Sequence, residues 1–227
     1  MSNDILVFVE LQNGDIRKVT PQLVSAARPL AEARGGKLHA LLVGEGIGEL
    51  ARKAATLGVD SVAVVEDPSL ADYTAEAYTE AITRASKHLG AGALLFGNTS
   101  IGKDIAPRVA QRLGVGMISD VTGTISTSGN PIFKRPVYAG KAVTHVEVLE
   151  SSFVISVRAN SYPSAPAAAS PAPIQSLAVA PDPSKIRTKV KEVVVRAAGK
   201  VDLTEADIIV SGGMGVKGPE GFEFLRP

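Results

Sequence analysis

The sequence contains no cysteine and no tryptophan, and aromatic residues make up only 4% of its 227 positions. The lack of cysteine excludes disulfides, thiolate metal sites and cysteine nucleophiles, and it is most compatible with a reducing compartment. Because large aromatic side chains are scarce, the core must be built mainly from Ala, Val, Leu and Ile. This composition is typical of buried parallel strands flanked by alanine-rich helices.

The chain also lacks an excess of charge, since 24 basic side chains are balanced by 23 acidic ones. A nearly neutral chain has no long-range field to attract nucleic acid or anionic lipid, so neither partner is expected. The start MSNDILVFVE has neither the basic nor the apolar region of a signal peptide, and about 18 consecutive apolar residues occur nowhere. We therefore expect a soluble, cytoplasmic protein without membrane insertion.

Apolar runs alternate with helical segments over the first half of the chain, at intervals that fit βαβ units. This pattern predicts a parallel sheet with helices on both faces, joined by right-handed crossovers. The predicted strands cover residues 5–10, 37–43, 61–66 and 93–98. The predicted helices cover residues 21–34 (with Thr20 as N-cap), 48–57, 74–89 and 103–113, and a glycine follows each of them.

After Gly116 the hydrophobic period changes from helical to two, which indicates strands joined by tight turns. The expected strands, at 117–125, 132–138, 142–149 and 153–158, would form an antiparallel hairpin region added to the parallel core. Residues 161–185 hold six of the 14 prolines and read as an extended connector without regular structure. Two further strands are expected at 189–197 and 207–211. We thus predict an α/β domain over residues 1–188 and the beginning of a second, incomplete domain over 189–227.

Residues 97–103, GNTSIGK, fit the phosphate-loop pattern G-x-x-x-x-G-K between a predicted strand and a predicted helix. Position 104 is Asp, where a phosphate loop needs a hydroxyl for Mg²⁺, and its carboxylate would repel phosphates. The alternative is an ordinary helix entry, in which Thr99 or Ser100 caps the helix. We favour this second interpretation.

Residues 213–218, GMGVKG, fit the pattern G-x-G-x-x-G, which is a weak signal by itself. The motif follows a predicted strand, and Pro219 with Glu220 suits a first helical turn. Backbone amides and a helix dipole could therefore receive a pyrophosphate or polar flavin atoms. The alternative is a tight strand-to-helix turn that binds no ligand.

Catalytic and metal-ligating side chains do not form a recognisable pattern. His39, His88 and His145 have no Asp, Glu or His at ligand spacing, so neither a metal site nor a charge-relay triad is expected. The motif G-x-S-x-G does not occur, and no pair of carboxylates has a spacing that demands acid–base work. We assign no catalytic residue.

Four sequence blocks, taken together and in this order, resemble the α subunits of the electron transfer flavoprotein family. The blocks are LLFGNTSIGKDIAPRVAQRLGVGMISDVTGT, RPVYAGKAVTHVEV, FVISVRANSY and IIVSGGMGVKGPEGF, with a Pro/Ala connector before the last. The resemblance covers nearly the whole chain. The combination of an ISD block, a YAG hairpin, an SVR strand and an SGG-x-G-K-G loop is far more specific than any single motif.

This resemblance implies an αβ heterodimer, in which the N-terminal domain and most of the β subunit form a base and the C-terminal domain binds FAD. It implies that AMP binds only to the β subunit. Electrons would arrive from acyl-CoA or other flavin dehydrogenases and leave to a quinone reductase or a similar acceptor. The protein would be an electron carrier and not an enzyme, because no substrate bond is made or broken.

The chain departs from the family pattern in two places. Where the family usually has SGGRG, with an arginine against the FAD, this chain has Met214. The later FAD motifs should follow Pro227, so we expect a truncated form that holds flavin weakly by itself, since few contacts oppose the entropy of association. The FAD-binding residues that the resemblance carries over are Ser211, Gly212, Gly213, Met214 and Gly215.

Two competing functions are open at this point. The first is a stand-alone nucleotide-binding module of the adenine-nucleotide hydrolase or universal-stress type, which the βαβ core resembles in outline. The second is an assembly scaffold that docks on the β subunit and carries no cofactor. Whether the chain is an electron carrier or an assembly scaffold, we expect the antiparallel region, residues 132–158, to form the interface with the β subunit. Its apolar side chains include Val137, Tyr138 and Val143.

Overall fold

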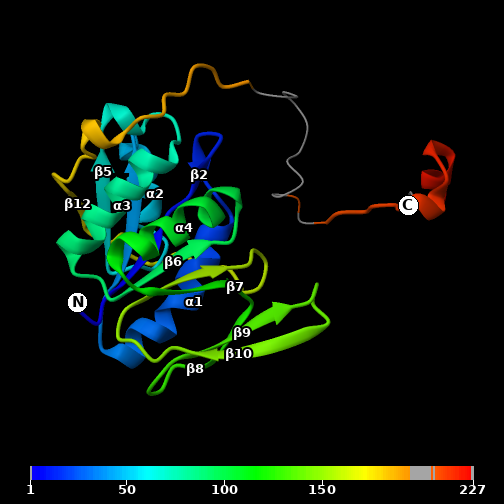
Figure 1. Cartoon of the computed structure of the whole chain (residues 1–227), viewed down its shortest axis with the longest axis horizontal. Coiled ribbons are helices and arrows are strands. Elements are labelled where there is room, and N and C mark those ends of the chain that lie inside the picture. The colour runs from blue at the N-terminus through cyan, green and yellow to red at the C-terminus, as the bar shows by residue number, and fades with distance from the viewer. Residues whose placement is uncertain (1, 195–205, 207, 226–227) are drawn as a thin grey trace. The chain divides into compact units, whose positions relative to one another are not determined.

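The computed structural model describes residues 2–194, 206 and 208–225 (Figure 1). The chain divides into two compact units, Met1–Lys191 and Glu192–Pro227. The division falls three residues beyond the boundary expected from the sequence. Each unit is considered by itself.

The first unit is built on a seven-stranded sheet with the order β12-β5-β4-β1-β6-β11-β7, in which all neighbouring strands are parallel. The central strands are buried on both faces because their runs of Val, Leu, Ile and Ala leave no polar side to turn toward solvent. The strands are β1 (Ile5–Phe8), β4 (Leu38–Gly44), β5 (Ser61–Glu66), β6 (Ala93–Gly97), β7 (Gly116–Val121), β11 (Phe153–Val157) and β12 (Ile174–Ser176).

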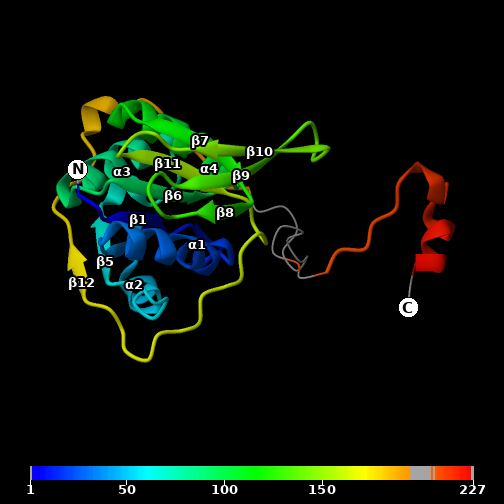
Figure 2. The ribbon, with the colours of Figure 1, turned by 90° about the horizontal axis from the view of Figure 1, so that it is seen from below.

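Helices cover both faces of this sheet, as predicted (Figures 1 and 2). Residues of α1 and α2 pack in one apolar cluster, and residues of α3 and α4 pack in the other. Three of the predicted glycine stops are confirmed, because Gly35, Gly90 and Gly114 adopt the left-handed conformation at the helix ends. The helices are α1 (Val19–Arg34), α2 (Gly48–Ala54), α3 (Ala75–Leu89) and α4 (Ser100–Leu113).

Two helix starts differ from the sequence-based expectation. Helix α1 begins at Val19 with Lys18 as N-cap, so Thr20 lies inside the first turn and does not cap it. Helix α4 begins three residues earlier than expected, at Ser100, because the Thr99 side chain already caps it. Both differences lie at helix ends, where the hydrophobic period gives little information.

A small antiparallel sheet, with the order β10-β9-β8, confirms the predicted strands at 132–138 and 142–149. The expectation of a single antiparallel strand at 117–125 is wrong, because most of it forms β7, which pairs in parallel with β11, and only its end belongs to β8. Its strands are β8 (Gly123–Ser126), β9 (Ile132–Val137) and β10 (Ala142–Glu147). Phe133 of β9 is fully buried in the core of the first unit, which ties this sheet to the parallel one. A two-stranded hairpin, β2 (Leu11–Gln12) with β3 (Asp15–Ile16), was not predicted from the sequence.

The prediction that residues 153–158 form a fourth antiparallel strand is wrong. Strand β11 lies between β6 and β7 and pairs with both in parallel. All five of its residues are buried, and the one polar member, Ser156, hydrogen-bonds to Asn98. A single buried serine in an apolar run imitates the alternation of a half-exposed strand.

The connector, residues 161–185, is more regular than predicted. It contains the edge strand β12 and the 3-10 turn η2 (Pro183–Lys185). Backbone hydrogen bonds from the amide of Ala172 to Ala55 and from the amide of Leu177 to Val64 hold it against the domain. Proline is tolerated here because an edge strand needs donors on only one side.

In the second unit, residues 208–213 form no strand, although one was predicted at 207–211. The same holds for residues 189–194 of the strand expected at 189–197, whose last three positions lie outside the described residues, as does position 207. A strand needs a neighbour for its hydrogen bonds, and Ile208 and Val210 are 85% and 66% exposed. Among the described residues of this unit, the regular elements are the 3-10 helices η4 (Met214–Val216) and η5 (Pro219–Leu225).

Candidate functional site

The glycine loop at residues 211–215 carries the residues expected to bind FAD. It leads into the short helix η4, in which the amide of Val216 donates to the carbonyl of Gly213 at 3.1 Å. The amide of Lys217 then donates to Met214 at 3.2 Å, and Lys217 itself takes the left-handed conformation with φ of 58°. The loop is therefore a compact turn of its own.

The glycines of this loop differ in their surroundings. A Cβ atom on Gly212 would approach the side chains of Val216 and Phe222 to 2.9 Å, so internal packing demands glycine there. A Cβ atom on Gly213 or Gly215 would meet nothing within 4 Å. Open backbone of this kind is what close approach of a ligand to main-chain amides needs. The residues present thus fit a cofactor that contacts the loop from outside.

Two details of the expected cofactor cradle differ in the structure. Pro219 does begin a helix, but the helix is the 3-10 segment η5, and the α-helical dipole expected behind the loop is not formed by residues 219–225. The side chain of Met214 is 99% exposed, so it offers an apolar contact and no charge to a ligand at the loop.

A buried carboxylate stands at the topological switch point of the parallel sheet, between β1 and β6. Open α/β sheets usually bind ligands in the crevice beside the carboxyl ends of such strands. Here Glu10, which follows β1, is only 1% exposed, and it accepts a 2.6 Å hydrogen bond from the hydroxyl of Thr99 after β6. The guanidinium of Arg17 pairs with its other oxygen. Glu10, Arg17 and Thr99 thus bond to one another, so the side chains at the usual nucleotide position are occupied by contacts within the chain.

The phosphate-loop pattern at residues 97–103 is a helix entry, as favoured from the sequence. The Thr99 hydroxyl accepts the amide of Gly102 at 3.0 Å and caps α4. A Cβ atom on Gly102 would lie 1.8 Å from the carbonyl oxygen of Gly97, so glycine is needed for helix–strand packing. Asp104 accepts hydrogen bonds from Tyr73 and Arg108, which occupies its carboxylate.

The ISD and SVR blocks meet in one polar cluster beside the ends of β6 and β11. Asp120 has a left-handed backbone with φ of 63°, and both of its carboxylate oxygens accept hydrogen bonds from the guanidinium of Arg158. Asn98 donates to the same carboxylate, and Ser156 donates to Asn98. The hydrogen bonds from Arg158 lower the pKa of Asp120 below its usual range, although burial opposes this. Paired in this way, the cluster positions backbone and has no acid–base role.

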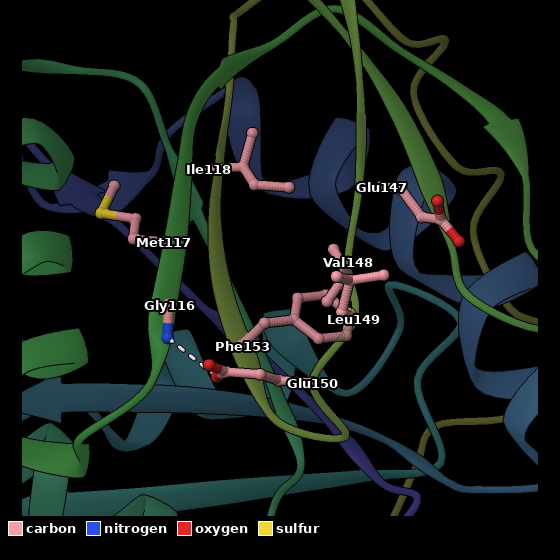
Figure 3. A pocket seen from close by; sticks show the side chains of 8 residues that line it. All are labelled: Gly116, Met117, Ile118, Glu147, Val148, Leu149, Glu150 and Phe153. Carbon is pink, nitrogen blue, oxygen red and sulfur yellow. Dashed lines mark hydrogen bonds between the residues drawn. The ribbon is translucent and has the colours of Figure 1, made fainter.

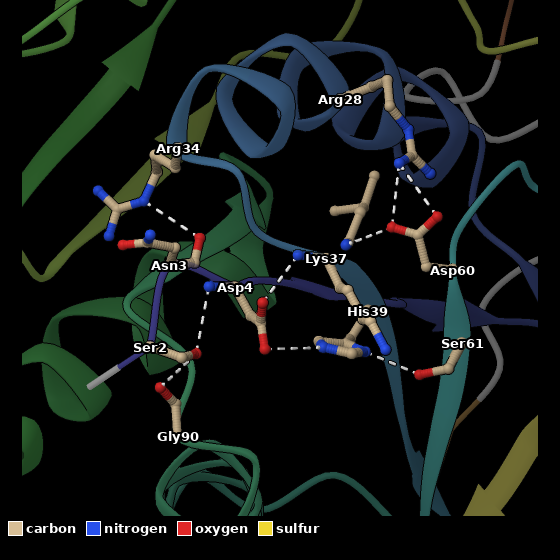
Figure 4. A network of polar contacts seen from close by, with 11 residues as sticks. Ser2, Asn3, Asp4, Arg28, Arg34, Lys37, His39, Asp60, Ser61 and Gly90 are labelled. Atoms are coloured by element: carbon tan, nitrogen blue, oxygen red, sulfur yellow. Dashed lines mark hydrogen bonds and ion pairs between the residues drawn. The ribbon is translucent and has the colours of Figure 1, made fainter.

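His39 does have an acidic partner, contrary to the expectation from spacing. Its Nδ1 lies 2.7 Å from the Ser61 hydroxyl, and its Nε2 lies 3.5 Å from a carboxylate oxygen of Asp4, which comes from a different strand (Figure 4). Asp4 also accepts the amide of Lys37. Burial opposes its ionisation, but the hydrogen bonds from Lys37 and His39 outweigh burial and lower its pKa.

These side chains lie at the amino ends of β1, β4 and β5, opposite the ligand edge of the sheet. Asp60 completes the cluster by accepting the amide of Leu38 and the guanidinium of Arg28 (Figure 4). Each carboxylate is bonded to main-chain amides that start a strand. The cluster therefore fixes strand starts, and the Ser–His–Asp sequence of contacts is not a catalytic arrangement.

A cavity of about 210 Å³ lies beside the edge strand β7 (Figure 3). Its lining is mainly apolar, with Met117, Ile118 and Phe153 among the side chains. The carboxylate of Glu150, which belongs to the lining, accepts a hydrogen bond from the amide of Gly116 at 3.3 Å. With that group already bonded, the cavity offers apolar contact surface and no cradle for phosphate.

Within the described ranges, no group of three or more His, Cys, Asp or Glu side chains could hold a metal ion. No helix in that part of the chain is long and apolar enough to cross a bilayer. Neither observation bears on the residues outside those ranges.

The fold and these sites define a class: a doubly wound α/β protein with its switch point filled by its own carboxylate, followed by a glycine loop in a separate unit. A family model described as the electron transfer flavoprotein domain matches residues 5–182. The chain belongs to the electron transfer flavoprotein family.

Individual relatives agree with this assignment. The chain is 35% identical over 227 residues to the electron transfer flavoprotein subunit alpha of Bacillus subtilis, covering 100% of this chain and 69% of that protein. It is 34% identical over 239 residues to the protein of the same name from Thermoanaerobacterium thermosaccharolyticum, covering 98% and 68%. It is also 34% identical over 227 residues to Protein FixB of Clostridium saccharobutylicum, covering 97% and 67%.

Proposed function

We propose that the chain acts as the α subunit of an electron transfer flavoprotein, and that its glycine loop contributes to an FAD site completed with a β subunit. The observation that carries the proposal is the open backbone at Gly213 and Gly215, in a chain whose relatives are named for this function. Bound FAD supplies the redox chemistry, while the protein provides placement and electrostatics. The residues proposed to contact it are Ser211, Gly212, Gly213, Met214 and Gly215.

The first unit supports a division of labour between the subunits. The carboxylate of Glu10 fills the crevice where a nucleotide would otherwise bind, which favours AMP binding in the β subunit alone. The same observation argues against a stand-alone ATP or AMP module. Because the loop offers few contacts by itself, we propose that this polypeptide holds FAD weakly without further protein around it.

In this assignment the chain is an electron carrier and not an enzyme. We propose flavin dehydrogenases, such as acyl-CoA dehydrogenases, as electron donors and a quinone reductase or comparable protein as the acceptor. The support is the family membership, because the relatives are named electron transfer flavoprotein subunits. The proposed setting is the cytoplasm.

The hairpin formed by β9 and β10 is our proposed contact with the β subunit. Tyr138 at its tip is 81% exposed, and Val143 on β10 is 55% exposed. Val148, by contrast, is 7% exposed and serves the chain's own core. Residues 132–147 carry three Lys or Arg side chains and one acidic side chain, Glu147 at the end of the hairpin away from Tyr138, so we expect a partner surface that is acidic around an apolar pocket.

The proposal is tested by co-expression with an electron transfer flavoprotein β subunit. Two versions of the chain are compared: residues 1–227, and the same residues extended by the C-terminal third of the Bacillus subtilis relative. We expect both to co-purify with the β subunit and only the extended one to retain stoichiometric flavin after gel filtration. Failure of both versions to bind the β subunit would reject the assignment.

Further outcomes separate the competing functions. A heterodimer that stays colourless even with the extended chain would favour the scaffold interpretation. Binding of ATP or AMP by residues 1–227 alone, measured by calorimetry, would favour the nucleotide-binding module. Bound AMP that disappears when the β subunit is omitted would support the proposed division between the subunits.

A further inference from the structure

One face of α3 holds the segment that leads from the first unit to the second. Glu76, Glu80 and Arg84 are spaced four residues apart, so they lie on the same face of the helix. Each contacts residues 177–188, which we call the strap. At its beginning, the guanidinium of Arg84 donates to the carbonyl of Ala180 at 2.6 Å.

The second contact is made by Glu80, whose side chain is only 8% exposed. One of its carboxylate oxygens accepts Lys185 Nζ of the strap at 3.1 Å, and the other accepts Arg112 of α4 at 2.9 Å. This carboxylate therefore joins α3, α4 and the strap. Ile186, the next strap residue, packs against the apolar cluster beneath α3.

The third contact, at Glu76, is the most extensive. Its Oε2 accepts the backbone amides of Arg187 at 2.6 Å and Thr188 at 3.1 Å, together with the Thr188 hydroxyl. Its Oε1 accepts two hydrogen bonds from the Arg187 guanidinium. The backbone hydrogen bonds from Arg187 and Thr188 lower the pKa of Glu76 to about 2.

The order of these contacts shows that the strap runs antiparallel to α3. The helix positions fall from 84 to 80 to 76 while the strap positions rise from 180 to 185 to 188. An isolated exposed ion pair would contribute little. Here one carboxylate accepts main-chain amides and a guanidinium together, which is the strong kind of hydrogen bond.

We propose that Glu76, Glu80 and Arg84 form an anchoring track that holds the strap along α3 and fixes Thr188 as the point at which the chain leaves this helix. Residues 189–191, the tether, follow the track directly and are the last residues of the first unit. The track itself belongs entirely to the first unit.

Limited digestion of the folded chain with trypsin tests this inference, because the segment contains cleavage sites inside and outside the track. In the unaltered protein, cleavage after Lys189 in the tether should be faster than cleavage after Lys185 or Arg187. In Glu76→Gln, which loses the charge but keeps the helix, cleavage after Arg187 should accelerate about tenfold. Mass spectrometry of the early products identifies each site.

A matched control and a second measurement complete the test. Glu49→Gln removes an exposed carboxylate on α2 that pairs with Arg52, and it should leave every rate in the strap unchanged. Arg187→Gln leaves α3 intact, and it should speed amide hydrogen exchange at Thr188 while β1 and β4 stay protected. If Glu76→Gln unfolds the domain, the hydrogen exchange of Thr188 in Arg187→Gln tests the inference by itself. Equal cleavage after Arg187 and Lys189 in the unaltered protein, or unchanged Thr188 exchange in Arg187→Gln, would overturn the inference.

Discussion

At the scale of single residues, Gly102 shows how a glycine can resemble part of a binding motif while serving only packing. It completes a phosphate-loop pattern in the sequence, yet its α-carbon faces the carbonyl of Gly97 so closely that a Cβ would lie 1.8 Å from the oxygen. This oxygen belongs to the backbone, so it cannot move away as the end of a flexible side chain could. The residue allows α4 to begin directly behind β6.

Gly102→Ala should therefore destabilise the first unit by about 2–3 kcal/mol, because the helix or the strand must shift to admit a methyl group. Urea denaturation followed by circular dichroism measures the change. Gly48→Ala is the control, since a Cβ at the start of α2 meets nothing within 4 Å and should be neutral or slightly stabilising. Equal stability of the two variants would contradict the packing argument.

Met214 is the second residue-scale test, and it rests on the proposed function. The family usually places an arginine at this position against the FAD, and reduction adds negative charge to the flavin. Met214→Arg should therefore raise the midpoint potential of the flavin and tighten FAD binding in the extended heterodimer, because a nearby cation stabilises the reduced form. Spectroscopic redox titration and FAD titration measure the two effects. An unchanged or lower potential would reject this role for position 214.

At the scale of elements, the sequence predicts the ends of three helices because each of them stops at a glycine in the left-handed conformation. These glycines are Gly35, Gly90 and Gly114. The fourth helix, α2, was expected to run to residue 57 but ends at Ala54, with Ala55 as its C-cap. Sequence-based prediction fails where the pairing of a strand depends on other strands of the sheet. Strand β11 lies between β6 and β7 in the parallel sheet. The local pattern of residues 153–157 does not say which strands will pair with it.

The candidate sites follow the same rule. The glycine loop at 211–215 is recognisable from its motif. The strand expected before it is not formed by residues 208–211, because a strand needs a neighbouring strand that no motif supplies. The pairs Asp120–Arg158 and Glu76–Arg187 join residues 38 and 111 positions apart. Spacing rules for helices and hairpins do not reach that far, so these contacts appear only in the folded chain.

The hairpin tip presents the most exposed aromatic side chain of the first unit's hairpin. Tyr138 and Ala139, in the turn that joins the antiparallel strands β9 and β10, have positive φ of 52° and 55°, as hairpin turns often require. This conformation costs a residue other than glycine about 1 kcal/mol. The turn leaves the ring of Tyr138 81% exposed, and exposed aromatic side chains are common anchors of protein interfaces.

Tyr138→Asp should weaken binding of the β subunit at least about tenfold, because it replaces a buried anchor by a charge. Aspartate tolerates the left-handed conformation, so the turn itself is preserved. Tyr138→Phe keeps the ring and should bind nearly as well. Affinity measured by surface plasmon resonance distinguishes the two, and undiminished binding by Tyr138→Asp would remove the hairpin from the interface.

At the scale of the whole first unit, stability should depend on pH in one direction. Asp4 and Asp60 are each held ionised by main-chain amides, against the opposing effect of burial, and the guanidinium of Arg158 does the same for Asp120. Each pKa is lower in the folded chain than in the unfolded chain. The unfolded state therefore binds more protons in acid, and stability is lost as pH falls through the folded pKa values.

We expect the urea midpoint to be nearly constant from about pH 7 to pH 5 and to fall steeply below about pH 4, where the unfolded carboxylates take up protons. Asp120→Asn should cost about 1 kcal/mol at pH 6, since a charge-assisted hydrogen bond is lost at a partly exposed site. This difference should shrink as the pH falls below about 4, because the unfolded chain then takes up a proton at Asp120 that the folded chain does not. Glu45→Gln, at an exposed loop position, should run parallel to the unaltered protein throughout. A difference for Asp120→Asn that grows with acid would mean that the folded chain does not stabilise the carboxylate form.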